Sequence, residues 1–184
     1  ELNESEASAL YAGIVVDTKN FAVQTGERTF EAAAYLRRHG ADPGLVHKLF
    51  RDEMATVVQR AKLVADARTP IPGLAFSVYK NAPSGDHTSV ILAQAADELV
   101  TMSEVKVSVV MAETENELLV SARSDGSVNV QTIMEELGGG GHQTVAGVQL
   151  KGVKAEEVEP QIIELARKQM EERDTNESNI TARY

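Results

Sequence analysis

Apolar positions in the first part of the chain recur at the spacing of a helix face, at Leu10, Tyr11, Ile14 and Val15. Asn3, with Glu6 three residues later, predicts a capping box at the start of this helix. The same kinds of signal predict further helices: one capped by Thr29 and ending at Arg38, a short one opened by Asp42 and Pro43, and one over 52–67. We therefore expect a helical N-terminal part.

The pattern changes at Thr69–Gly73, where two prolines and a glycine cannot continue a helix. Beyond it, strands are predicted at 74–80, 105–113, 118–123 and 145–151, and helices at 89–102, 128–137 and 155–173. The predicted fold is α/β. It has a helical part with a connector helix over 1–67, a small α/β domain with a mixed sheet flanked by helices over 68–174, and a polar, disordered tail over 175–184.

Composition excludes several classes of function. Without cysteine, the chain has no disulfide scaffold, thiolate-bound zinc or thiol nucleophile. The net charge of −10 disfavours binding along a long nucleic-acid duplex, and the aromatic content of 4% disfavours a stacking platform for long single strands. No apolar stretch is long enough to span a membrane, and the acidic N-terminus is not a signal peptide. A small anionic ligand is still compatible with this composition.

The strongest local signal is the run Gly138–Gly141, followed directly by His142. Glycine costs roughly 0.5–1 kcal/mol relative to alanine in regular structure, so such a run needs a reason. One interpretation is a flexible hairpin or a helix stop. The other is that Gly139, Gly140 and Gly141 let an anion or a base edge approach their N–H groups, with His142 as a directional donor. Taken alone, His142 is more often a structural or surface residue.

Two further signals involve an arginine and an aspartate. Arg123 ends a predicted strand and precedes a hydroxyl-rich turn that begins at Ser124. Its guanidinium suits phosphate oxygens, although pairing with a nearby carboxylate is an equal alternative. Asp17 follows an apolar run and can be interpreted as a ligand for a hard metal ion or as the end of a helix. The string Asp86-His87 is interpreted as part of a turn.

These signals, in this order, resemble the DHH phosphoesterase superfamily with its C-terminal DHH-associated domain. The glycine run with His142 and the following Val145-Ala146-Gly147 resembles the hallmark of that associated domain. Longer strings narrow the resemblance to the GdpP-type cyclic-di-AMP phosphodiesterases, at residues 12–21, 25–33, 93–99 and 121–131. The resemblance extends over about residues 5–172. Ala146-Gly147 is a small departure, because GdpP-type proteins often carry Ala-Ala there.

The resemblance implies a parent enzyme that hydrolyses cyclic-di-AMP to pApA with two manganese ions. It implies that Asp17 is one metal ligand and that the other ligands lie upstream of this chain. It also implies a substrate-binding set, with Arg123 for phosphate charge, Gly139, Gly140 and Gly141 for close backbone contact, and His142 and Ser124 for hydrogen bonds. The implied partner is a cyclic dinucleotide or short oligonucleotide. The implied location is the cytoplasmic side of a membrane-anchored parent, with no membrane contact by this part.

The chain begins at Glu1 without an initiator methionine, and we interpret it as an excised fragment. A single carboxylate should not assemble a two-metal centre, so we expect the fragment to be inactive alone. Residues 1–60 are expected to expose apolar surface, which predicts a homodimer or a rearranged N-terminal lobe. Two alternatives stay open: a nano-RNase or pAp phosphatase of the same superfamily, and a non-catalytic nucleotide-binding module.

Overall fold

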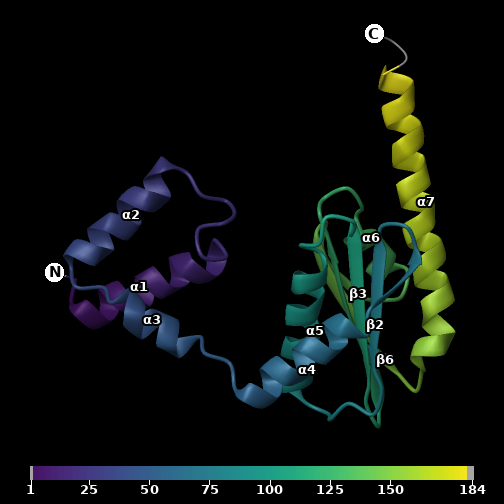
Figure 1. The fold of residues 1–184 in the computed structure, drawn as a ribbon, viewed down its shortest axis with the longest axis horizontal. Helices are drawn as coiled ribbons and strands as arrows, with labels where there is room; N and C mark the ends of the chain where they lie inside the picture. The colour runs from purple at the N-terminus through teal and green to yellow at the C-terminus, as the bar shows by residue number, and fades with distance from the viewer. Residues whose placement is uncertain (1, 182–184) are drawn as a thin grey trace. The chain divides into compact units, whose positions relative to one another are not determined.

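The computed structural model describes the backbone of residues 2–181 and the side chains of residues 2–173 (Figure 1). The chain forms two compact units, which divide between Glu53 and Met54. The sequence predicted the division after the connector helix, whereas the structure has it before. The reason is that α4 (Met54–Ala65) packs on α5 (Asp86–Leu99), where Leu63 is buried in the same apolar cluster as Leu92.

The first unit contains α1 (Glu4–Asp17), α2 (Glu27–Arg38) and α3 (Pro43–Leu49). The predicted capping box of α1 is confirmed: the Asn3 side chain accepts from the Glu6 N–H, and the Glu6 carboxylate accepts from the Asn3 N–H, both at 2.9 Å. Asp42 caps α3 by accepting from the Gly44 N–H at 2.8 Å. A small core is formed by side chains from these helices and their connections, at Ala7, Leu36 and Ala41.

Helix α2 begins before the residue that the sequence suggested as its cap. Gly26 is the N-cap, and Thr29 lies three residues inside, where its hydroxyl accepts from the Gly26 N–H at 3.3 Å. Thr29 therefore acts as the backward-reaching partner of a capping box, and the helix starts at Glu27.

The first unit leaves large apolar side chains exposed, as the sequence predicted for residues 1–60. Among them are Leu10 (55% exposed), Phe30 (54%), Leu49 (68%) and Phe50 (51%). So short a set of helices has too little interior to bury them all. The oligomeric state that we inferred from this exposure stays a prediction.

The second unit is built on a six-stranded sheet with the order β1-β2-β3-β4-β6-β5. Strands β2 and β3 are parallel and are joined through α5, and every other neighbouring pair is antiparallel. The strands are β1 (Arg68–Ile71), β2 (Leu74–Tyr79), β3 (Val107–Glu113), β4 (Glu117–Ser124), β5 (Gly140–His142) and β6 (Val145–Lys151). The predicted mixed sheet is thus confirmed, including the β3–β4 hairpin.

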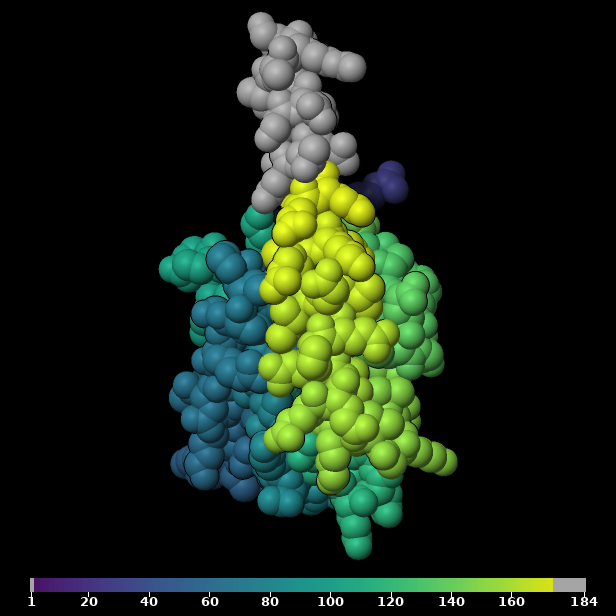
Figure 2. Space-filling view, turned by 90° about the vertical axis from the view of Figure 1, so that its right-hand side faces the viewer, coloured from purple at the N-terminus to yellow at the C-terminus, as the bar shows by residue number. Residues whose placement is uncertain are grey.

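Helices cover both faces of this sheet and create two apolar cores. Helices α6 (Val130–Glu135) and α7 (Ala155–Thr181) cover one face, and Figure 2 shows α7 lying lengthwise over it. Helices α4 and α5 cover the other face, on which α5 contacts β3 and β4. Among the described residues, α5 does not pack on β5 and β6 to the extent that it packs on β3 and β4, and Gly141 and His142 at the glycine-rich edge are exposed.

Two strands escaped the sequence prediction. Strand β1 includes Pro70, because an edge strand has one side without ladder partners and tolerates the missing N–H. Strand β5 includes Gly140 and Gly141, whose weak strand propensity hid it. Helix α5 begins at Asp86, so Asp86 and His87 form its first turn rather than a separate turn; Gly85, at φ 129°, ends the preceding loop.

Helix α7 continues to Thr181, beyond the end predicted at Arg173. The backbone over 174–181 is helical rather than disordered, and this stretch contains neither glycine nor proline to stop it. The rest of the predicted tail, residues 182–184, lies outside the described residues. Across the described part of the chain, no helix combines the length and the apolar character needed to cross a bilayer.

Two buried serines on the α5 side of the sheet should differ in what they contribute to stability. Ser108 donates to the Ala96 carbonyl at 2.7 Å, whereas the Ser77 hydroxyl has no hydrogen-bond partner among the described residues. We expect Ser108→Ala to lower the free energy of unfolding by about 1 kcal/mol, and Ser77→Ala to leave it unchanged or to raise it. Urea unfolding of both variants tests this. Equal destabilisation would show that the Ser77 hydroxyl is also satisfied.

Candidate functional site

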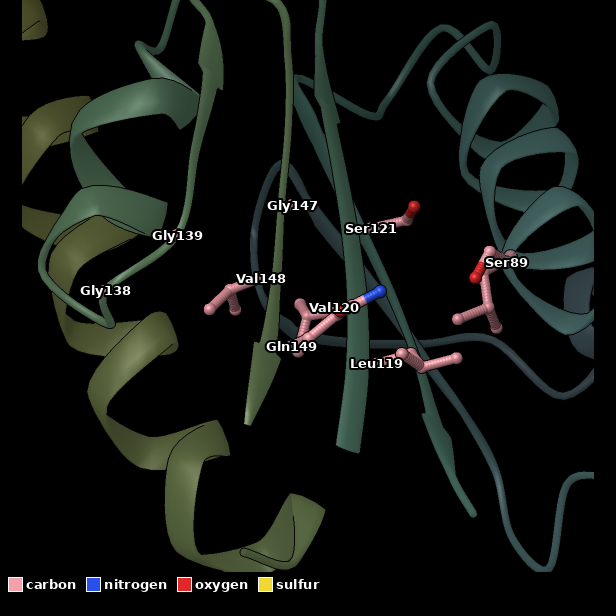
Figure 3. A pocket seen from close by; sticks show the side chains of 10 residues that line it. Ser89, Leu119, Val120, Ser121, Gly138, Gly139, Gly147, Val148 and Gln149 are labelled. Atoms are coloured by element: carbon pink, nitrogen blue, oxygen red, sulfur yellow. The ribbon is translucent and has the colours of Figure 1, made fainter. Parts of the chain in front are cut away.

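A cavity of about 500 Å³ lies on the α5 side of the sheet, beside β4 and β6 (Figure 3). This volume is within the range of small-molecule sites in proteins. The lining residues come from α5, β4, β6 and the loop after α6: Ser89, Leu92, Leu119, Val120, Ser121, Gly138, Gly139, Gly147, Val148 and Gln149. Of the predicted glycine run, Gly138 and Gly139 border the cavity, whereas Gly140, Gly141 and His142 are not among its lining residues.

Strand pairing places two predicted site residues in one row across the sheet. Arg123 of β4 pairs with Val145 of β6, and Val145 pairs with His142 of β5. Paired residues of antiparallel strands project to the same face. His142 is exposed on the edge strand, so its ring is accessible to a ligand.

The neighbouring row on that face carries glycines. Ser121 pairs with Gly147, and Gly147 pairs with Gly140. Leu118, Val120 and Ala122 of β4 point into the core under α6 and α7. Because side chains alternate along a strand, the β4 residues between them face the other way, toward α5. Because Gly147 and Gly140 have no side chains, β6 and β5 form a floor of bare backbone at this row. The floor lies between the row of Arg123 and the row in which Leu119 pairs with Gln149.

The positions of the run are glycine for different physical reasons. Gly138 ends α6 at φ 82°, and the N–H groups of Gly138 and Gly139 donate to α6 carbonyls. A Cβ on Gly139 would lie 2.4 Å from the Gly147 carbonyl oxygen, and one on Gly141 would lie 2.3 Å from the Val145 carbonyl oxygen. These positions are glycine because the β5 and β6 backbones approach closely, and the N–H of Gly139 is already used.

Gly140 differs from its neighbours. Its φ is not in the left-handed region, and a Cβ there would meet no atom within 4 Å. Neither conformation nor packing requires a glycine at this position. The close approach of a ligand that the sequence suggested for the run stays a prediction for Gly140, and no packing contact offers a competing reason.

Arg123 pairs with a carboxylate, which is one of the two interpretations that the sequence left open, and its contact with phosphate stays a prediction. Its side chain is largely buried, and its Nε donates to Asp97 of α5 at 3.2 Å while its Nη1 donates to the Ala122 carbonyl at 3.0 Å. A guanidinium has five N–H donors, so these contacts orient it without exhausting its capacity. Asp97, which the sequence analysis had not singled out, is the residue that fixes Arg123.

Helix α4 contacts the part of α5 that contains Asp97. Arg60 donates through Nη1 to Gln94 at 2.8 Å and forms an ion pair with Glu98 at 3.5 Å. At the other end of α4, the Thr56 hydroxyl and His87 Nε2 are 3.1 Å apart. The connector helix is thus fixed to the helix that carries Asp97.

Ser124 is held inside its own turn. Its hydroxyl donates to the Val128 carbonyl at 2.7 Å and accepts from the Gly126 N–H at 3.2 Å, and the residue is buried. The geometry gives Ser124 the role of shaping the loop after Arg123. The substrate contact predicted for it gains no support from these contacts.

Asp17 lies in the first unit, whereas the other predicted site residues lie in the second. It is the exposed last residue of α1, and the next turn places Lys19, Asn20 and Phe21 at φ 45°, 59° and 64°. Thr18 fixes this left-handed turn, because its hydroxyl donates to the Ile14 carbonyl and accepts from the Phe21 N–H. Consecutive non-glycine residues with left-handed backbone conformation are strained, and such strain is typical of functional sites.

The donor set of the described residues does not fit a two-metal centre. Such a centre needs several carboxylates and histidines around each ion. No group of three or more His, Cys, Asp or Glu side chains comes together anywhere in the described part of the chain. Asp17 alone does not complete such a centre.

Three cavity residues were missed by the sequence analysis as individual candidates: Ser89, Ser121 and Gln149. A signal for Gln149 was available, because strict alternation along 145–151 puts it on the same face as Gly147. The positions of Ser89 and Ser121 depend on how α5 packs on β4, which local pattern does not reveal.

Comparison with known proteins agrees with this architecture. The chain is 49% identical over 165 residues to the cyclic-di-AMP phosphodiesterase GdpP of Geobacillus thermodenitrificans, and 45% identical over 165 residues to the cyclic-di-AMP phosphodiesterase PdeA of Listeria monocytogenes. Each match covers 89% of this chain and 25% of the relative, so the chain spans about a quarter of the length of these curated relatives.

A solved structure shares the fold. The exopolyphosphatase-related protein of Bacteroides fragilis superposes with a TM-score of 0.74 at 15% identity, over 94% of this chain and 52% of that chain. The model of the DHHA1 domain family matches residues 74–172, which hold strands β2 to β6, the glycine run and Arg123. The chain therefore belongs to the DHHA1 domain family.

Proposed function

We propose that this chain is the nucleotide-recognition part of a longer, manganese-dependent phosphodiesterase that hydrolyses cyclic-di-AMP to pApA. One observation carries the proposal: the row of Arg123 and His142 lies directly beside the row of Ser121 and Gly147, and this second row lines a cavity of about 500 Å³. The relatives named cyclic-di-AMP phosphodiesterases support the choice of substrate.

The residues of the row divide the work of binding. The Arg123 guanidinium, held by Asp97, directs its remaining N–H donors at phosphate oxygens. His142, exposed on β5, donates a further hydrogen bond. Gly140 keeps the floor beside them free of side chains, so that the sugar-phosphate chain approaches the backbone. Local donors of this kind offset the net charge of −10 for a ligand as small as a dinucleotide.

Calorimetric titration with cyclic-di-AMP and with pApA tests the proposal. We expect binding by the 184-residue chain, and at least a 100-fold loss of affinity in the Arg123→Ala/His142→Ala double variant, because charge-assisted hydrogen bonds to phosphate are removed. Arg167→Ala, on α7 over the opposite face of the sheet, is the control and should bind normally. NMR spectra establish that each variant is folded.

Two results would contradict the proposal. Unchanged binding by the double variant would place recognition elsewhere, and absence of binding by the unmodified chain would show that these residues do not form a recognition site by themselves. Much tighter binding of linear pApA than of the cyclic form would favour a nano-RNase or pAp phosphatase.

A further inference from the structure

Three polar side chains converge on the cavity without a hydrogen bond of their own. They are Ser89 of α5, Ser121 of β4 and Gln149 of β6, and none of their side chains bonds to another described residue. Figure 3 shows the Gln149 amide reaching across β4 toward α5, with the Ser121 and Ser89 hydroxyls on the two sides of that space. Unused polar groups that point into one cavity are typical of a site that recognises a ligand.

Gln149 and Ser89 lie at the end of the cavity away from Arg123, and Ser121 lies between that end and Arg123. Along β4, Leu119 pairs with Gln149, four residues before Arg123. Strand geometry puts these rows about 13 Å apart. The α5 side has the same order, since Ser89 and Asp97 are eight residues apart on one helix face and Asp97 contacts Arg123. A nucleotide with its phosphate beside Arg123 and its base toward Gln149 spans this distance.

The walls at this end suit a flat heterocycle. Leu92 and Leu119 supply apolar surface, and the Gln149 amide supplies a donor and an acceptor side by side. Adenine presents the matching pair, because its N6 amino group donates and its N7 accepts. Guanine presents two acceptors on the same edge, so the amide oxygen would face another acceptor.

We propose that the cavity is a nucleobase subsite in which Gln149 reads an adenine edge, assisted by the hydroxyls of Ser89 and Ser121. This inference rests on the proposed function and adds the specificity element to it. Phosphate binding belongs to Arg123 and His142, and base selection belongs to the opposite end of the cavity.

The test is an NMR titration of the uniformly ¹⁵N-labelled 184-residue chain with three ligands: pApA, pGpG and an abasic dinucleotide with the same phosphates. We expect pApA to shift the side-chain amide resonance of Gln149, and the abasic analogue to shift the His142 region but not Gln149. Dissociation constants follow from the shifts at increasing ligand concentration.

Gln149→Met keeps the length of the side chain and removes its hydrogen bonds. We expect affinity for pApA to fall about tenfold or more, the size of one bidentate base contact, and affinity for the abasic analogue to stay the same. Ser89→Ala should give a smaller loss in the same direction. Gln161→Met, at an exposed position of α7, is the matched control and should change neither affinity.

The outcomes separate the two proposals. If the unmodified chain binds pApA and Gln149→Met binds it equally well, or if pGpG binds as tightly as pApA, the base subsite is refuted and the proposed function stands. If the variant weakens pApA and the abasic analogue alike, Gln149 is structural and the subsite is again refuted. If the unmodified chain binds none of the ligands, the proposed function fails and the subsite falls with it.

Discussion

Substituting alanine for Gly139 or Gly141 should destabilise the second unit severely. A Cβ at either position would overlap a backbone oxygen of β6, at 2.4 Å and 2.3 Å respectively, and backbone atoms cannot move aside as a flexible side chain can. Gly141 also has φ 150°, which L-residues rarely adopt. Overpacking and backbone strain each cost about 1–3 kcal/mol, so we expect a loss of about 3 kcal/mol or more in the free energy of unfolding.

Gly140→Ala is the matched control, one residue from each of these positions. Its added methyl group would meet open space, so unfolding in urea should have the same midpoint as in the unmodified chain. If Gly140 keeps the floor open for a ligand, the same variant should bind pApA more weakly while remaining folded. Equal destabilisation by all three substitutions would contradict the division of the run into packing and ligand positions.

The second large effect concerns catalysis by the chain alone. We expect no hydrolysis of cyclic-di-AMP above the uncatalysed rate with Mn²⁺ present, a deficit of at least about a million-fold relative to an enzyme. The reason is the donor set: within the described residues Asp17 has no group of His, Asp or Glu side chains to complete a metal centre. Chromatographic detection of pApA after prolonged incubation provides the measurement.

A matched variant makes this result decisive. Asp17→Asn keeps the size of the side chain and removes its charge. We expect the unmodified chain and this variant to form equally little pApA. Manganese-dependent product formation that disappears in Asp17→Asn would overturn the expectation and show that the chain assembles a working centre. Activity that persists in the variant would indicate a contaminating enzyme, which repurification of both chains would remove.

Elements with strong periodicity were predictable from the sequence. The capping box at Asn3, the Asp42–Pro43 start of α3, and the 145–151 strand agree with the structure, because local side-chain chemistry determines each of them. Strands β1 and β5 were missed because their place in the sheet depends on distant partners. In β1 the edge position accommodates Pro70, and in β5 the pairing with β6 compensates for glycine.

The candidate site was predictable in part. The glycine run, Arg123 and His142 were found in the sequence, and the sheet register brings them to one region. Their contacts were not predictable, because Asp97 meets Arg123 only through the packing of α5 against β4. In the same way, the Ser124 hydroxyl is used within its own turn, which depends on the conformation over 124–128.

The attachment of α4 to α5 sets the natural limits of this domain as a transferable module. Leu63 is buried in the core beneath α5, and Arg60 binds Gln94 and Glu98, so α4 is an integral part of the second unit. A domain boundary placed at the proline-containing segment Thr69–Gly73, whose sequence resembles a linker, would separate α4 from the sheet that it covers. A segment transferred with the fold of the second unit intact is therefore expected to begin near Glu53, in front of α4.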